Sequence, residues 1–229
     1  MPARVKICGI NTPEAMSAAL EARADLVGLV FFPPSPRHVS IEAAAPLADY
    51  ARGFSAIVAL VVDADDALID RIKSEINPDM LQLHGSETPE RVAAVRSMFG
   101  KPVMKAIKVA TRADALTAFA YAPVTQWLTE GATPTIADLI LFDAKPPKGA
   151  DRPGGHGATF DWTLLDDVRG RVPFMLSGGL TPDNVAAAIR ATGATVVDVS
   201  SGVETAPGLK NRGLIQRFIA AAHATQSDT

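Results

Sequence analysis

Three side chains able to move a proton stand at the ends of short apolar runs, where polar groups are out of place. Cys8 ends one run, His84 follows a second and Asp143 follows a third. A thiolate can accept a proton, and a carboxyl group in a partly dry pocket can retain a proton and donate it. Cys8 and Asp143 are therefore candidates for a catalytic base and a catalytic acid, and His84 is a candidate ligand contact.

Each of these residues also has an ordinary structural interpretation. A lone cysteine is most often a small buried hydrophobe. Asp143 could cap a helix or pair with Lys145, and His84 could be a structural histidine with its hydrogen bonds satisfied. The residue types alone leave both interpretations open.

Two segments rich in serine and glycine indicate a phosphate site. Ser177-Gly178-Gly179 and Ser200-Ser201-Gly202 follow the last two apolar runs, and Asp198 shares a face of its run with Ser200. Glycines let backbone N–H groups approach an anion, and a helix N-terminus adds favourable dipole charge. The alternative is two ordinary turns. A third cluster, Gly154-Gly155-His156-Gly157, is a weaker candidate for closing over the same region.

Arg37 follows the proline-rich segment Phe32–Pro36. A stiff loop would hold its guanidinium group ready to bind a carboxylate in a bidentate manner, although a solvated surface arginine is an equally good interpretation. No histidines or carboxylates have the spacing of metal ligands, and the single cysteine excludes a thiolate cluster. We therefore expect no metal site.

Eight apolar runs, most of them followed by a helix signal, must position these residues. Typical signals are Ser40 before Ile41, and Thr88-Pro89-Glu90 opening a helix that Gly100 closes. The runs are Val5–Cys8, Leu26–Phe31, Ala56–Val62, Met80–Leu83, Val103–Ile107, Leu139–Phe142, Phe174–Leu176 and Val196–Val199. The other expected helices begin near Thr12 and Thr181 or cover Ile41–Ala51, Asp65–Ile76, Thr111–Tyr121 and Arg212–Ala222, and Pro46 is expected to shorten or kink its helix.

Continuous apolar runs, each followed by a helix, are typical of parallel strands covered on both faces. Eight such units without a linker predict an α/β protein whose residues 1–229 form a single (β/α)₈ barrel, in which the loops after the strands build the active site. A doubly wound sheet is the rival, but the first turn, Cys8–Asn11, lacks the glycine-rich dinucleotide fingerprint. Two stretches, Ala122–Asp138 and Ala144–Thr159, do not fit the repeat.

Composition excludes several classes of function. The 229 residues are 48% hydrophobic and 21% charged, which is typical of a soluble globular protein, and the net charge of -3 argues against a nucleic-acid surface. The apolar runs are too short to span a bilayer, and the N-terminus lacks the apolar region of a signal peptide. We expect a cytoplasmic protein whose partners include neither nucleic acid nor membrane.

Taken together, the motifs closely resemble those of the phosphoribosylanthranilate isomerase family, in family order from residue 5 to about 208. The motifs are Val5-Lys6-Ile7-Cys8-Gly9-Ile10, Gln82-Leu83-His84-Gly85, Leu141-Phe142-Asp143, Phe160-Asp161-Trp162, Leu176-Ser177-Gly178-Gly179-Leu180 and Asp198-Val199-Ser200-Ser201-Gly202-Val203-Glu204. The family is a (β/α)₈ barrel acting in tryptophan biosynthesis. Asn11 stands where the family usually has threonine, and Ala122–Asp138 is longer than usual.

The resemblance implies a set of roles. Cys8 matches the general base, Asp143 the general acid, and Arg37 lies in the loop that holds the anthranilate carboxylate. The implied substrate is a small phosphoribosyl amine, rearranged without metal or cofactor by a monomer or a homodimer. Two alternatives remain: the related aminoaldose isomerase of histidine biosynthesis, which has aspartate at the position of Cys8, and a noncatalytic phosphate-binding barrel.

Overall fold

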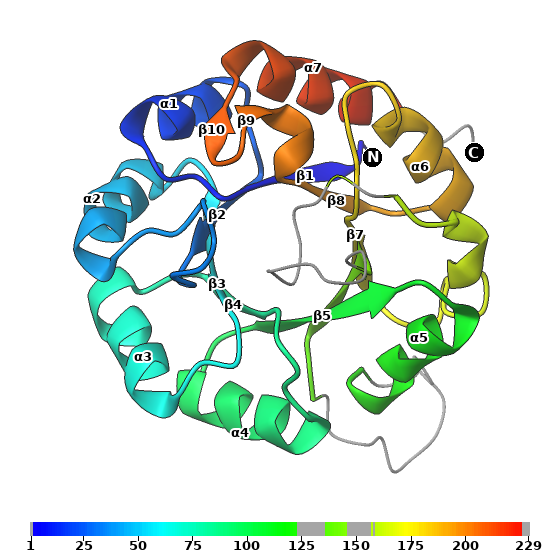
Figure 1. Cartoon of the computed structure of the whole chain (residues 1–229), viewed down its shortest axis with the longest axis horizontal. Coiled ribbons are helices and arrows are strands. Elements are labelled where there is room, and N and C mark those ends of the chain that lie inside the picture. The colour runs from blue at the N-terminus through cyan, green and yellow to red at the C-terminus, as the bar shows by residue number, and fades with distance from the viewer. Residues whose placement is uncertain (1, 123–135, 146–156, 158, 226–229) are drawn as a thin grey trace.

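A computed structural model describes residues 2–122, 136–145, 157 and 159–225 of the chain. Eight parallel strands close into a barrel in chain order, and β8 pairs with β1. Figure 1 looks down this barrel, with the strands around the centre and the helices in an outer ring. The predicted (β/α)₈ architecture is confirmed, and the open doubly wound sheet is excluded because the first and last strands are hydrogen-bonded to each other.

The eight apolar runs all form strands. The strands are β1 Arg4–Cys8, β2 Leu26–Val30, β3 Ala56–Val61, β4 Met80–Leu83, β5 Val103–Val109, β6 Leu139–Ala144, β7 Phe174–Leu176 and β8 Val196–Val199. Strand β6 runs beyond the predicted end at Phe142, so that Asp143 lies within the strand, in register with Lys108 of β5. The backbone of the candidate acid is therefore fixed by the sheet.

The outer ring follows the predicted capping signals closely. Its helices are α1 Pro13–Glu21, α2 Ile41–Ala51, α3 Asp66–Arg71 continued by the π-helix η1 Ile72–Ile76, α4 Pro89–Phe99, α5 Arg112–Leu116 continued by the 3₁₀ helix η2 Thr117–Ala120, α6 Val185–Thr192 and α7 Arg212–His223. The side chains of Thr12, Ser40 and Thr88 accept hydrogen bonds from the first turns of their helices, as N-caps do. No helix among the described residues is long and apolar enough to cross a bilayer.

Helix α2 has the predicted bounds, and Pro46 lies inside it without shortening it. Two features of the ring differ from the prediction. Helix α6 begins at Val185 rather than near Thr181. The backbone N–H of Thr181 donates to Oδ1 of Asn184 in the turn before it. In the described part of the sixth unit, a 3₁₀ turn, η3 Trp162–Leu165, follows β6 in place of an α-helix. Of the two irregular stretches, most of Ala122–Asp138 and of Ala144–Thr159 lies outside the described residues.

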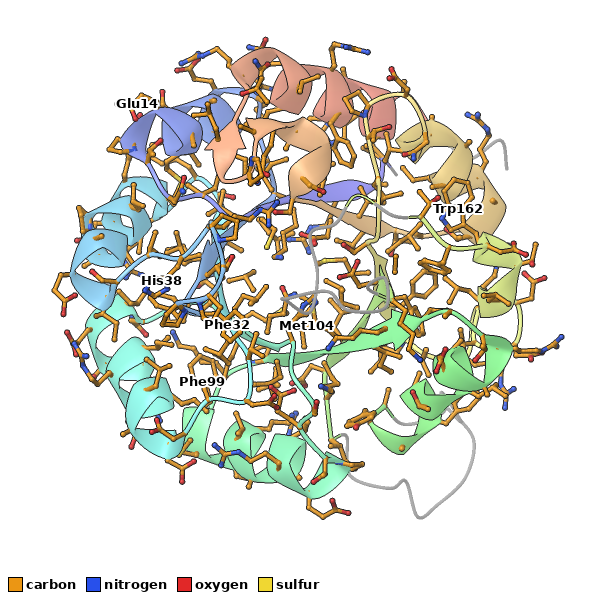
Figure 2. The ribbon with its side chains drawn as sticks, viewed as in Figure 1. Glu14, Phe32, His38, Phe99, Met104 and Trp162 are labelled. Carbon is orange, nitrogen blue, oxygen red and sulfur yellow. The ribbon has the colours of Figure 1, made fainter. Side chains whose placement is uncertain are left out.

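Apolar side chains pack on both sides of the sheet. The barrel interior holds Leu26, Val58, Met104, Ala106, Leu141 and Met175. A larger layer lies between the strands and the helices, and Figure 2 shows Met104 near the middle of the barrel and Phe99 on its helix side.

The chain adds a short hairpin after β8 that the sequence did not predict. A 3₁₀ turn, η4 Ser201–Val203, leads into β9 Glu204–Ala206, which pairs with β10 Leu209–Lys210. Gly208 turns the hairpin with φ +82°, in the region that favours glycine. An added Cβ there would lie 2.4 Å from the carbonyl oxygen of Pro36, so the hairpin packs directly on the loop of Arg37.

Candidate active site

A pocket opens at the carboxyl ends of the strands. This position is where barrels of this kind build their active sites. Every site residue predicted from the sequence lines it. These residues are Cys8, Arg37, His84, Asp143, Ser177, Gly178, Gly179, Asp198, Ser200, Ser201 and Gly202.

Cys8 and Asp143 reach the pocket from separate parts of the barrel wall. Strand β1, which carries Cys8, is separated from β6, which carries Asp143, by β7 and β8 on one side and by four strands on the other. Both residues are buried. A ligand in the pocket therefore lies between a thiol and a carboxyl group held on opposite arcs of one barrel.

The electrostatic environment of Cys8 favours the thiol over the thiolate. Burial raises the pKa of Cys8 above its ordinary value, and the nearby ammonium groups of Lys6 and Lys210 oppose this shift without overcoming it. Any cation that forms beside the sulfur would shift this pKa in the same direction as the two lysines.

Asp143 faces His84, and His84 belongs to a buried polar chain. The Nε2 atom of His84 lies 3.2 Å from Oδ2 of Asp143, and its Nδ1 atom lies 3.0 Å from Nε2 of Gln82. The Oε1 atom of Gln82 accepts a hydrogen bond of 2.8 Å from the ammonium group of Lys6. The candidate acid is thus linked by side chains to the interior of the barrel.

Asp198 sits at the other end of this chain. Its Oδ1 atom accepts from Lys6 at 2.9 Å, and its Oδ2 atom accepts from the hydroxyl group of Ser177 at 3.0 Å. Lys6 is fully buried and the Asp198 side chain nearly so. Burial alone would lower the pKa of Lys6, but Asp198 and, after it, Cys8 together outweigh burial, so the pKa of Lys6 is raised. Lys6 is therefore an ammonium group.

Arg37 is neither solvated nor free. Its Nε and Nη2 atoms donate to the two carboxylate oxygens of Glu204 at 2.8 and 2.7 Å, and both side chains are almost completely buried. Lys210 donates to the same carboxylate at 2.7 Å. Glu204 thus holds one edge of the guanidinium group. Within the part of the chain that the structure describes, the Arg37 side chain makes no other hydrogen bond, so its remaining N–H donors can serve a ligand in the pocket that it lines.

Cys8 and Asp143 mark two edges of the pocket. The glycine segments form its third edge through close backbone contacts. An added Cβ at Gly178 would lie 2.5 Å from the amide nitrogen of Ala144, and one at Gly202 would lie 1.9 Å from the carbonyl oxygen of Leu180. Side chains are therefore excluded at both positions, and the loops after β7 and β8 touch. Because α6 begins only at Val185, the amides of the first loop are not the N-terminus of that helix; Ser201 and Gly202 begin the 3₁₀ turn η4.

Several residues of the site were not predicted from the sequence. Glu204 and Lys210 were not expected to hold Arg37, although Glu204 lies in one of the family motifs. The apolar wall was missed as well. It comprises Val30, Phe32, Leu60 and Val62, which extend the inward face of β2 and β3. The alternation of inward and outward residues along a strand could have predicted this wall. Of the third glycine cluster, Gly154, Gly155 and His156 lie outside the described residues.

The arrangement suits acid–base chemistry on an anionic ligand. A thiol and a carboxyl group can exchange protons with a bound molecule from two sides, while backbone amides and Arg37 can bind negative groups. The apolar wall beside Cys8 can hold an aromatic or aliphatic part of the ligand.

Comparisons with known proteins identify the family of this chain. The sequence model of the family described as N-(5'-phosphoribosyl)anthranilate (PRA) isomerase matches residues 5–221. The N-(5'-phosphoribosyl)anthranilate isomerase of Rhodopseudomonas palustris (strain BisB5) is 56% identical over 97% of this chain and 96% of its own. That of Bradyrhizobium sp. (strain BTAi1 / ATCC BAA-1182) is 54% identical over 97% and 96%.

Solved structures give the same result. The phosphoribosyl anthranilate isomerase of Thermotoga maritima superposes with a TM-score of 0.83 at 36% identity, over 97% of this chain and 99% of that one. A phosphoribosyl anthranilate isomerase in complex with reduced 1-(o-carboxyphenylamino)-1-deoxyribulose 5-phosphate has a TM-score of 0.80 at 33% identity, with the same coverage. The chain belongs to the N-(5'-phosphoribosyl)anthranilate isomerase family.

Proposed function

We propose that this protein isomerises N-(5'-phosphoribosyl)anthranilate to 1-(2-carboxyphenylamino)-1-deoxyribulose 5-phosphate, a step of tryptophan biosynthesis. The observation that carries this proposal is the placement of Cys8 and Asp143 across one pocket whose third edge is made of glycine loops. Family membership supports the same reaction.

The reaction is an internal transfer of hydrogen that needs only an acid and a base. Asp143 donates its proton to the ring oxygen of the sugar, and the bond from C1 to that oxygen breaks. The nitrogen lone pair forms a C1–N double bond, which leaves an iminium cation. Cys8 gives its thiol proton to solvent, and Asp143 later recovers a proton from solvent. The Cys8 thiolate removes the proton from C2, the electrons of that bond form a C1–C2 double bond, and the nitrogen regains its lone pair.

The enolamine formed in this way tautomerises to the ketone: its C2 hydroxyl group loses a proton and C1 gains one. Atoms and electrons balance without an oxidant, a metal or a cofactor, and we propose that none is used. The iminium cation also lowers the pKa of Cys8, which burial raises in the empty pocket. A positive charge beside the sulfur favours the thiolate at the step that needs the base.

The remaining pocket residues receive binding and positioning roles in this proposal. The amides of Gly178, Gly179, Ser201 and Gly202, with the Ser177 and Ser200 segments, bind the phosphate group. Arg37 binds the anthranilate carboxylate with the donors that Glu204 leaves unused. Asp198 acts through Lys6 and Ser177, because both of its carboxylate oxygens are engaged by them.

The test is to mix the protein with phosphoribosylanthranilate and follow the fluorescence of the anthranilate group, which the reaction removes. A loss of emission whose initial rate is proportional to enzyme concentration supports the proposal. Unchanged emission would contradict it and would favour the histidine-pathway aminoaldose isomerase or a noncatalytic phosphate-binding barrel.

For the cellular setting, we propose a cytoplasmic enzyme whose partner is its small phosphoribosyl substrate rather than nucleic acid or membrane. We propose a monomer or a homodimer as the assembly. One similar solved protein, from Thermotoga maritima, is described as a dimeric phosphoribosylanthranilate isomerase converted to monomers. The mass of this protein in solution, measured by sedimentation, decides between the two states.

A further inference from the structure

Gln82 has no part in the proposed reaction, yet it is completely buried among polar groups at the base of the pocket. It lies between the ammonium group of Lys6 and the imidazole ring of His84. His84 in turn lies against the carboxyl group of Asp143. A buried amide between a cation and a titratable ring costs free energy unless its hydrogen bonds are specific.

The chemistry of Lys6 determines how Gln82 is oriented. An ammonium group has three donors and no acceptor, so the Gln82 atom that faces it at 2.8 Å must be the carbonyl oxygen. The amide nitrogen of Gln82, which can only donate, is then the atom 3.0 Å from Nδ1 of His84. Nδ1 must therefore accept, and a neutral imidazole that accepts at Nδ1 carries its proton on Nε2.

We propose that Lys6 and Gln82 are positioning residues that fix His84 as the Nε2–H tautomer and so present an N–H donor to the Asp143 side of the pocket. This inference rests on the proposed function only for its catalytic consequence. The Nε2 atom is buried and has no aligned hydrogen-bond partner among the described residues, because the direction of the 3.2 Å contact with Asp143 departs from that of a hydrogen bond.

The donor serves the step in which Asp143 becomes negative. When Asp143 gives its proton to the ring oxygen, a carboxylate forms in a buried environment, and an N–H group aimed at it stabilises the charge. The other tautomer would place a lone pair of Nε2 against the carboxylate and disfavour the same step. The tautomer of His84 is thus part of what makes Asp143 an effective acid.

The direct test is ¹⁵N nuclear magnetic resonance of the labelled full-length protein, with the His84 signals assigned by their loss in His84→Gln. We expect a neutral ring with its proton on Nε2 and an unprotonated Nδ1. A proton on Nδ1 of His84 in the unmutated protein overturns the proposal. The measurement is made on the unmutated protein, so that His84→Gln, used for the assignment, is the one variant that has to fold.

Gln82→Glu is the matching substitution, since a carboxylate of the same length still accepts from Lys6 but can no longer donate to His84. We expect Nδ1 of His84 to become protonated in this variant. Gln216→Glu, which adds the same charge on the exposed face of α7, serves as the control and should leave the His84 signals unchanged. An unprotonated Nδ1 in Gln82→Glu overturns the proposal.

A pair of substitutions at His84 tests the catalytic consequence. The amide nitrogen of glutamine reaches the place of Nε2, so His84→Gln keeps a donor, whereas His84→Leu keeps only bulk. We expect His84→Leu to lower kcat about 10- to 100-fold with a smaller change in KM, and His84→Gln to restore most of that loss. Equal losses in both variants, or no loss in His84→Leu, contradict this role. If the unmutated protein does not isomerise phosphoribosylanthranilate at all, the proposed function fails and the tautomer result stands alone.

Discussion

The two halves of the pocket are built in different ways. On the side of β1, β4 and β6, the pocket is lined by buried side chains: Cys8 and Asp143 stand on strands, and His84 directly follows β4 and contacts Gln82 and Asp143. On the side of β7 and β8, the lining is mainly the backbone of two loops that touch at Gly202. Proton transfer needs particular functional groups in fixed places, whereas binding a phosphate needs only donors and room. The first half is therefore suited to chemistry and the second to binding.

The largest effects are expected from the proposed acid and the proposed base. Cys8→Ala and Asp143→Asn should each lower kcat by about 10² to 10⁴, because each removes a positioned proton-transfer group. Neither change touches the glycine loops, so product affinity, measured by titration calorimetry, should stay near that of the unmutated protein. Near-normal turnover in either variant would refute the role of that residue.

Removal of Arg37 should act on binding. Arg37→Ala deletes a charge-assisted contact with a carboxylate, which contributes about 1.5 to 3 kcal/mol, so KM should rise about 10- to 100-fold while kcat changes less. Arg37→Lys is the control, since it keeps the charge and loses the fork that Glu204 holds. An unchanged KM in Arg37→Ala would exclude the assigned contact.

One added methyl group in each half of the pocket tests separately the two functions, catalysis and substrate binding. An added Cβ at Gly28 would lie 3.0 Å from the sulfur of Cys8, whereas one at Gly202 would lie 1.9 Å from a loop carbonyl oxygen. Overpacking typically costs a fold about 1 to 3 kcal/mol, and a loss of that size in transition-state or substrate binding would change the matching kinetic constant about 5- to 160-fold. Steady-state kinetics should show Gly28→Ala lowering kcat and Gly202→Ala raising KM. A rise in KM for Gly28→Ala together with a fall in kcat for Gly202→Ala would mean that the two halves do not separate catalysis from binding.

The smallest effect concerns stability and pH. Burial alone would raise the pKa of Glu204, but its bonds to Arg37 and Lys210 outweigh burial and the pKa lies below the ordinary value. A carboxylate of this kind stabilises the fold above its unfolded pKa of about 4.3, and that contribution is lost as pH falls through the lower folded value. Denaturant unfolding should show Glu204→Gln less stable than the unmutated protein at pH 7, with the difference narrowing below about pH 4.

Glu14→Gln is the matched control for that measurement, because Glu14 is exposed on α1, as Figure 2 shows. Its effect on the free energy of unfolding should be small at both pH values. A Glu204→Gln difference that widens as the pH falls would contradict the expected direction of the pH dependence.

The fold and the chemical half of the site were predictable because they follow from local patterns. Apolar runs mark the strands, and a polar residue at the end of a strand, such as Cys8 or Asp143, is an exception that alternation places on the inward face. The positions of Ser177–Gly179 and Ser200–Gly202 after the last two strands likewise predicted that these loops line the pocket.

The partners of these residues were not predictable in the same way. Arg37 and Glu204 are 167 residues apart, and Lys6 and Asp198 are 192 apart. No local pattern selects one long-range partner among many, because pairing depends on how the closed barrel aligns its strands. The hairpin that carries Lys210 is also too short to give a strand signal, although Pro207-Gly208 marks its turn.

The central claim is that Cys8 and Asp143 face the substrate from opposite sides, and a crystal structure of this protein with the reduced product analogue tests it most directly. We predict that the sulfur of Cys8 will contact C2 of the sugar chain on one side and that a carboxyl oxygen of Asp143 will contact the oxygen on C4 from the other. A ligand that meets both groups on one side, or that meets only one of them, would contradict this claim.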